Sequence, residues 1–191
     1  VTREFYINDA GNQIEKFAVS LNTRFLQAVY GEDCIKMPED AYHGQDITDH
    51  VKAYINEFGD GIKDSEESER KSKLTAYALE KNIESLKRDT GKYGITYDKW
   101  FFESSLHESG KVNEVIELLK KNGYTYEKED ALWFKATEFG AEKDVVLIRS
   151  NSYPTYFASD IAYHKDKIDR GFDMLINIWG ADHHGHVARV K

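Results

Sequence analysis

The stretch from Ile176 to His186 constrains the fold of this chain more than any other. It reads Ile-Asn-Ile-Trp-Gly-Ala-Asp-His-His-Gly-His, so an apolar, strand-like run breaks at Gly180 and is followed by an acid and three histidines. In an α/β sheet, polar side chains directly after a strand lie at the carboxyl edge, where ligands bind. The sequence therefore predicts an α/β fold with a ligand site at this strand end.

The composition is that of an ordinary globular protein. Of the 191 residues, 40% are hydrophobic and 31% are charged, enough to bury a substantial core. No run of about 18 apolar residues occurs and the start of the chain has no secretory signal pattern, so we expect a protein without membrane contact. The single cysteine, Cys34, excludes an internal disulfide and fits the cytoplasm.

The net charge of −8 argues against an autonomous nucleic-acid-binding protein. Affinity for phosphate comes from lysine and arginine side chains that displace counterions, and such proteins normally carry a basic face. Any RNA contact must therefore be local, or supplied by parts of a larger protein.

Hydrophobic periodicity and turn residues predict alternating helices and strands. We expect helices over residues 13–29, 47–58, 74–88, 112–121 and 155–170, and strands over 1–7, 95–102, 131–135, 144–149 and 174–179. Gly31 is expected to stop the first helix and Asp46 to cap the second, whereas residues 63–73 form a charged run typical of a solvated helix start or loop.

This order suits a parallel-sheet domain split by a mostly helical insertion. It does not suit a complete domain, because the predicted parallel strands at the two ends need a central sheet between them, and the middle supplies too few candidates. We therefore expect a fragment of a larger protein.

The helix that follows Pro154 carries an unusual face. Tyr156, Asp160, Tyr163 and His164 are spaced i, i+4, i+7 and i+8, which places them on one side of the helix. A carboxylate with a phenol beside it suits a planar guanidinium, which Asp160 can bind through two parallel hydrogen bonds. A partly exposed face with only local hydrogen bonds is the alternative, and spacing alone leaves both open.

The loop after Gly180 allows three interpretations. Asp182, His183, His184 and His186 are ligand types that zinc accepts, although no second, spaced cluster supports a metal site. As a nucleotide site, Gly180 would let a ligand approach the backbone and Asp182 would accept from ribose hydroxyls. In the third interpretation the histidines only cap the following helix.

Polar residues also follow the first predicted strand. Asn8, Asp9 and Gln13 stand where that strand ends and the next helix begins. They can line the same crevice, or Asn8 or Asp9 can cap the helix, and capping is the favoured interpretation.

Three long motifs together resemble the catalytic domain of bacterial arginyl-tRNA synthetases: Tyr6–Ile14, Pro154–His164 and Trp179–Gly185. Shorter similar segments stand between them in the same order, and the resemblance covers essentially the whole chain. They are Phe102–Leu106, Gly123–Glu127 and Ala131–Phe134.

The resemblance implies a class I aminoacyl-tRNA synthetase, which activates arginine with ATP to arginyl-adenylate and transfers it to the 3′ end of its tRNA. It implies a Rossmann-type fold in which residues 1–30 are a first-half strand and helix, 31–145 a connective insertion with a small β-hairpin region, and 146–191 a second-half strand and helix. Arginine, ATP and tRNA would be the partners of the parent enzyme.

The resemblance also implies roles for individual residues. Tyr156, Asp160 and Asn8 would contact arginine, whereas Asp9 and Gln13 would line the pocket near the tRNA end. The residues against ATP would be Gly180, Asp182, His183 and His184. Mg²⁺ would act in the parent enzyme, with no metal bound by this chain.

Two signatures of the family do not occur in this sequence. The HIGH-type motif, which holds the ATP phosphates, would precede Val1, and the KMSKS-type motif would follow Lys191. We therefore expect the chain to be inactive alone, and an acidic fragment to bind tRNA weakly or not at all. The alternative function is a metal-dependent hydrolase that uses Asp182, His183, His184 and His186.

Overall fold

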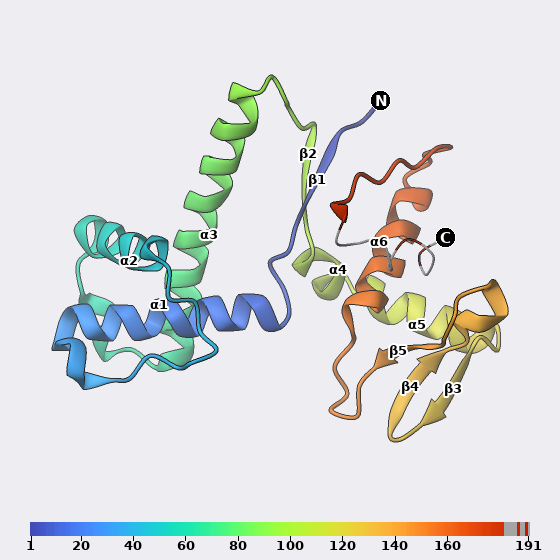
Figure 1. Cartoon of the computed structure of the whole chain (residues 1–191), viewed down its shortest axis with the longest axis horizontal. Helices are drawn as coiled ribbons and strands as arrows, with labels where there is room; N and C mark the ends of the chain where they lie inside the picture. Colours follow the sequence, from blue (N-terminus) through green and yellow to red (C-terminus); the bar gives the residue numbers. More distant parts are fainter. Residues whose placement is uncertain (182–186, 188–189, 191) are drawn as a thin grey trace. The chain divides into compact units, whose positions relative to one another are not determined.

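The computed structural model describes residues 1–181, 187 and 190. The chain forms two compact units, residues 1–102 and 103–191, and each is described by itself (Figure 1). In the described part no helix is both long and apolar enough to cross a membrane.

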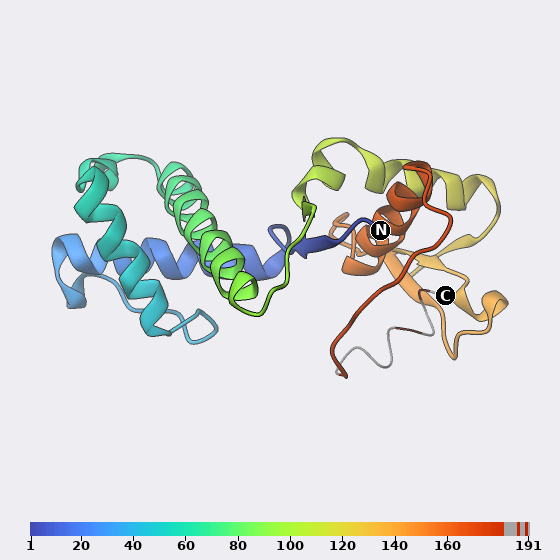
Figure 2. The same ribbon diagram turned by 90° about the horizontal axis from the view of Figure 1, so that it is seen from above.

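Three helices make the core of the first unit. They are α1 (Asn12–Tyr30), α2 (Gln45–Phe58) and α3 (Glu67–Lys92), with short 3₁₀ turns at Glu32–Cys34 and Gly61–Asp64. In Figure 2 the three helices lie against one another within this unit. Their apolar faces meet in one buried cluster: Leu21, Phe25, Ile47, Val51, Tyr54, Leu74 and Ala78. The amphipathic patterns of all three helices therefore predict their buried sides correctly.

Glycines end the first two helices. Gly31 (φ 101°) and Gly59 (φ 75°) adopt a left-handed backbone that favours glycine, and each donates its N–H to a carbonyl of the preceding turn. The predicted stop at Gly31 is confirmed. The predicted cap at Asp46 is wrong, because Gly44 is the cap residue and Asp46 lies in the first turn. Its charge there still favours the helix N-terminus.

Helix α3 is longer than its apolar pattern predicts. The charged run over residues 63–73 includes its first turns, where Glu67 lies 2.9 Å from Lys71 and Glu69 lies 2.7 Å from Lys73. Such i,i+4 pairs support a helix that shows no apolar periodicity. The interpretation of this run as a solvated helix start is confirmed.

A two-stranded parallel sheet accompanies the helices. Strands β1 (Glu4–Ile7) and β2 (Lys99–Phe102) pair in register from Glu4 with Lys99 to Ile7 with Phe102. The predicted strands over 1–7 and 95–102 are both present but shorter. In the structure β1 pairs with β2, which follows α3 in the chain.

The second unit is a small antiparallel sheet with helices. It contains α4 (Ser104–Glu108), α5 (Lys111–Lys121), β3 (Thr125–Lys128), β4 (Ala131–Phe134), a 3₁₀ turn (Ala136–Phe139), β5 (Val145–Ile148) and α6 (Tyr156–Asp169). The strands pair antiparallel in the order β3-β4-β5, so the predicted strands over 131–135 and 144–149 are present as the hairpin β4–β5. Helix α4 and strand β3 are additional elements that the sequence did not indicate.

The predicted strand over 174–179 is wrong: this segment is irregular. Its alternate apolar residues Met174, Ile176 and Ile178 are 78%, 78% and 93% exposed. A strand is stable only when a neighbour pairs with its backbone groups and covers its apolar face. An apolar run alone therefore does not determine a strand, and Gly180 follows an extended irregular segment.

Candidate functional site

The start of α6 is anchored to β5. The Thr155 N–H donates to the Leu147 carbonyl at 2.8 Å and the Thr155 hydroxyl donates to the Val146 carbonyl at 2.7 Å. Pro154 also forms a bridge with Ile148. These bonds fix where the helix begins, and hence the position of its first exposed residue, Tyr156.

The predicted polar face of α6 divides into two parts. Tyr156 is 40% exposed and Asp160, one turn further, is half-buried, so both reach the surface. Tyr163 is buried, and the Lys167 ammonium lies 4.0 Å from the centre of its ring. The surface pair that a ligand can reach therefore consists of Tyr156 and Asp160, whereas Tyr163 belongs to the packing of the helix.

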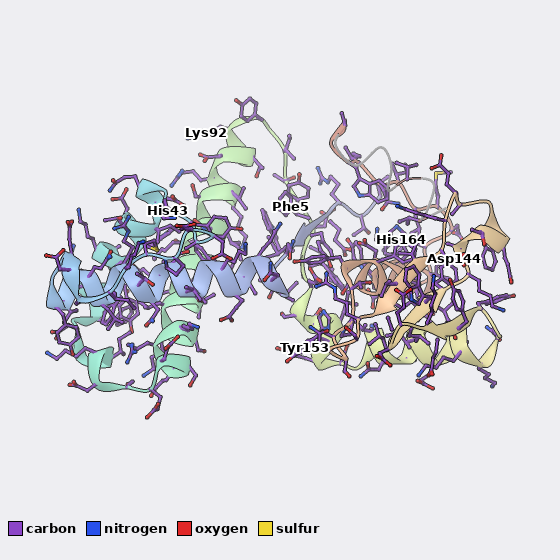
Figure 3. All side chains as sticks on the ribbon, turned by 60° about the horizontal axis from the view of Figure 1, so that its bottom comes forward. Phe5, His43, Lys92, Asp144, Tyr153 and His164 are labelled. Carbon is purple, nitrogen blue, oxygen red and sulfur yellow. The ribbon has the colours of Figure 1, made fainter. Side chains whose placement is uncertain are left out.

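His164, the last residue of the predicted face, is half-buried (Figure 3). Its Nδ1 lies 2.8 Å from the Asp160 main-chain carbonyl, which can only accept, so Nδ1 carries the hydrogen and Nε2 is the acceptor. Burial lowers the pKa of His164 below its usual range, against the opposing effect of the bond to Asp160. The imidazole is thus kept neutral at neutral pH.

The irregular segment before Gly180 lies against α6. Lys167 donates to the Asn177 side-chain oxygen at 2.8 Å, and the Trp179 ring lies 6.5 Å from the His164 ring. These contacts place Trp179 and Gly180 beside the same helix that carries Asp160. Two of the three predicted motifs therefore meet within the second unit.

An open hollow of about 520 Å³ lies at this segment. Among the described residues its lining is Asn177, Trp179, Gly180, Ala181 and Val187. This volume falls in the range of small-molecule pockets. The predicted ligand residues Asp182, His183, His184 and His186 lie outside the described residues, so Gly180 is the one predicted nucleotide residue that the structure places at the hollow.

The polar residues after β1 lie in the first unit. The Asn8 side chain donates to the Gln13 side-chain oxygen at 3.3 Å. The cap of α1 is Gly11 (φ 78°), without a side-chain cap bond, so the favoured interpretation that Asn8 or Asp9 caps this helix is wrong. The structure brings Asn8 and Gln13 together, and Tyr156 and Asp160 together, each pair in its own unit.

Sequence reasoning missed a buried carboxylate on α6 itself. Asp166 is 4% exposed and accepts from the Lys111 ammonium of α5, and the Arg170 guanidinium lies 2.9 Å from its other oxygen. This network ties α5 to α6. The signal was in the sequence: Asp166 stands three and four residues after Tyr163 and Ala162, on the apolar side of the helix.

A second buried carboxylate, Glu103, is the cap residue before α4. It is 2% exposed, its Oε1 lies 3.8 Å from the His107 Nε2, and the same nitrogen lies 3.3 Å from the hydroxyl of buried Ser159 on α6. Glu103 directly follows β2, so the strand-end argument used for Gly180 would have singled it out as well.

Comparison with known proteins shows which proteins the chain is similar to. No family model matches the chain. Over its full length the chain is 56% identical to the arginine–tRNA ligase of Acetivibrio thermocellus and 60% identical to that of Caldanaerobacter subterraneus subsp. tengcongensis. The chain is homologous to a segment of the arginine–tRNA ligases. It spans about a third (34%) of the length of these relatives.

Solved structures agree with this assignment. A protein from Campylobacter jejuni, assigned as an arginyl-tRNA synthetase, is 36% identical with a TM-score of 0.85, over 99% of this chain and 41% of that chain. The arginyl-tRNA synthetase of Plasmodium falciparum is 15% identical with a TM-score of 0.66, over 99% of this chain and 32% of that one, and shows the fold alone. The predicted α/β class, as part of an arginyl-tRNA synthetase fold, is confirmed.

Proposed function

We propose that this chain forms the arginine- and ATP-binding part of an arginine–tRNA ligase, an enzyme that activates arginine with ATP and transfers it to tRNA. The observation that carries the proposal is the identity of 52–60% with arginine–tRNA ligases over essentially the whole chain. Such identity argues against a different reaction. The alternative function, a metal-dependent hydrolase, has no comparable support.

Asp160 and Tyr156 are proposed to receive the guanidinium of arginine. The Asp160 carboxylate is half-buried, where an ion pair is screened less than at the surface, and the Tyr156 phenol lies one turn away at the helix start. A carboxylate can accept two parallel bonds from a guanidinium but not from an ammonium. The pair would therefore favour arginine over lysine. For Asn8, the motif alone supports a proposed role in binding arginine.

The hollow beside Trp179 and Gly180 is proposed to receive the adenosine of ATP. Its wall has an indole and a residue without a side chain, so a flat ring can approach the backbone closely. Neutral His164 beside Trp179 would support this wall without adding a charge. Asp182, His183 and His184 are proposed to complete the ATP contacts.

The remaining assignments rest on the motifs. Asp9 and Gln13 are proposed to line the pocket near the tRNA end, and residues 31–145 to be the connective insertion between 1–30 and 146–191. Among the described residues no group of three or more histidine, cysteine, aspartate or glutamate side chains can hold a metal ion. Mg²⁺ usually takes only one or two carboxylates together with substrate phosphates. It is proposed to act in the parent enzyme, and we assign no step to it here.

Ligand titration tests the proposal directly. Backbone amide chemical shifts are recorded while arginine, citrulline or lysine is added to the chain. Citrulline has the shape of arginine without its charge, so we expect saturable shifts on α6 with arginine and weaker or no shifts with the other two. Equal shifts with arginine and citrulline, or arginine shifts that avoid α6, would contradict the proposal.

A further inference from the structure

One side chain of α6 contacts both parts of the proposed site. Lys167 is half-buried, and its ammonium lies 4.0 Å from the centre of the Tyr163 ring, one turn back along the helix. The same ammonium donates to the Asn177 side-chain oxygen at 2.8 Å. Tyr163 follows Asp160 by three residues on the same side of the helix, whereas Asn177 lines the hollow beside Trp179. Lys167 thus links the helix face that carries Asp160 to the wall of the hollow.

The segment that follows α6 is irregular. After Gly171 (φ 81°) the chain turns back past the helix, and residues 172–179 lie in no helix or strand (Figure 1). The apolar side chains of Ile176 and Ile178 are 78% and 93% exposed. A segment with little buried apolar surface opens locally at a low cost in free energy. The position of this segment beside α6 therefore depends on the contacts that its side chains make.

The surroundings of Lys167 favour a defined position of its ammonium. Tyr163 is 8% exposed, so its ring is held by the packing of α6 and offers a fixed face to the cation. A charge-assisted hydrogen bond, such as the one to Asn177, is about twice as strong as one between neutral groups. The rings of His164 and Trp179, 6.5 Å apart, add an uncharged contact between the same two elements. Lys167 therefore supplies a charged contact that a single substitution can remove.

A second lysine of α6 provides a matched control. Lys165 is also half-buried, and its ammonium lies 2.6 Å from a carboxylate oxygen of Asp169 and 3.6 Å from one of Glu114. Residues two apart do not face each other on a helix, so Lys165 and Lys167 lie on different sides of α6. The partners of Lys165 are carboxylates of α5 and α6, whereas Lys167 contacts the segment after the helix.

We propose that Lys167 is a positioning residue, which fixes the segment Asn177–Gly180 against α6 and thereby couples the binding of arginine to that of ATP. The inference rests on the proposed function for the identity of the two ligands. The ligand that binds first orders the helix face and the segment together, so the second ligand loses less conformational entropy when it binds. Linkage requires each ligand to tighten the binding of the other by the same factor.

Calorimetric titration of arginine, with and without saturating ATP, measures the coupling. In the wild-type chain we expect ATP to tighten arginine binding at least about fivefold, and in Lys167→Met less than about twofold. Methionine keeps an unbranched side chain but removes the charge and the donor. Lys167→Arg is expected to restore the coupling, because a guanidinium can stack on the Tyr163 ring and donate to Asn177. Lys165→Met is expected to behave like the wild type.

Nuclear magnetic resonance relaxation without ligands tests the contact itself. In Lys167→Met the order parameters of the backbone amides from Asn177 to Gly180 are expected to fall below about 0.6, while those of α5 stay near about 0.85. A general loss of structure would lower the order parameters of α5 as well. Lys165→Met is expected to leave the segment as ordered as in the wild type.

Three results would overturn the inference. They are unchanged order parameters in Lys167→Met, equal coupling in Lys167→Met and Lys165→Met, or a loss of ATP affinity in Lys167→Met when arginine is absent, which would make Lys167 a direct ligand contact. If both ligands bind the wild type without coupling, the inference fails and the proposed function stands. If neither ligand binds the wild type, the proposed function fails and the coupling with it, and the order parameters alone decide whether Lys167 fixes the segment.

Discussion

The two units of this chain bury different kinds of residue. Among the described residues, the buried polar side chains of the first unit are neutral (Ser20, Asn22 and Thr23), whereas those of the second include the carboxylates Glu103 and Asp166. Burying a carboxylate costs free energy unless partners compensate it. The first unit is thus held by an apolar helical core, and the second keeps charged networks around α6, the helix that presents the candidate arginine site.

The largest expected effect tests the apolar half of this comparison. Phe25 is completely buried in the cluster of α1, α2 and α3. Phe25→Ala removes its packing and leaves a cavity, so we expect a loss of about 3–5 kcal/mol in the free energy of unfolding. Urea unfolding measured by far-UV circular dichroism gives this quantity. A loss below about 1 kcal/mol would mean that the cluster is not the core of this unit.

The next effect tests the charged half. Asp166→Ala leaves Lys111 and Arg170 without their shared carboxylate, and we expect a loss of roughly 2–3 kcal/mol. Lys111 and Arg170 both remain partly exposed to solvent, so the expected loss in the free energy of unfolding is smaller than for a fully buried ion pair. The control is Asp169→Ala on the same helix, whose side chain is 52% exposed and which should unfold like the wild type. Equal unfolding curves for the two variants would show that the buried network of Asp166 does not stabilise the second unit.

A smaller effect concerns pH. Because burial lowers the pKa of folded His164, the unfolded chain binds this proton more readily than the folded chain. The stability that neutral His164 contributes to the folded chain is fully present above the unfolded pKa of about 6.5. It is lost as the pH falls below that value, by at most about 1.4 kcal/mol per pH unit. Urea unfolding at pH 7.5 and at about pH 5.5 should show this loss in the wild type and a smaller loss in His164→Gln. The same loss in both would exclude His164 as its source.

The smallest effect is expected at the surface of the first unit. The Glu69–Lys73 pair at 2.7 Å is half exposed at both ends, and such pairs contribute little. Lys73→Ala should leave the thermal midpoint unchanged within error. A clear drop would show that the first unit also depends on charge, and the contrast between the units would weaken.

Particular residues show how far sequence reasoning reached. Gly31, the apolar faces of α1–α3 and the strands from 131 to 149 follow from local rules, because turn geometry and amphipathic burial act over a few residues. The strand over 174–179 failed because strand formation needs a partner elsewhere in the chain, which the local pattern does not specify.

The site was predicted in part. Helical spacing correctly placed Tyr156 and Asp160 near each other at the surface, but it also included Tyr163, which is buried. Spacing defines one side of a helix but not how neighbouring elements cover it. Asp166 and Glu103 were missed because an acid in a sequence looks like a surface residue unless its position is compared with that of neighbouring elements. Lys111, the partner of Asp166, lies on α5, whereas His107, the partner of Glu103, lies one turn further along α4.

The central claim is that α6 presents Asp160 to a guanidinium, and one measurement tests it most directly. The dissociation constant for arginine is determined for the wild-type chain, Asp160→Asn and the matched variant Asp169→Asn. The account predicts that Asp160→Asn weakens arginine binding by about tenfold or more, the loss of a hydrogen-bonded charge pair, while Asp169→Asn binds like the wild type. Equal dissociation constants for the two variants would contradict it.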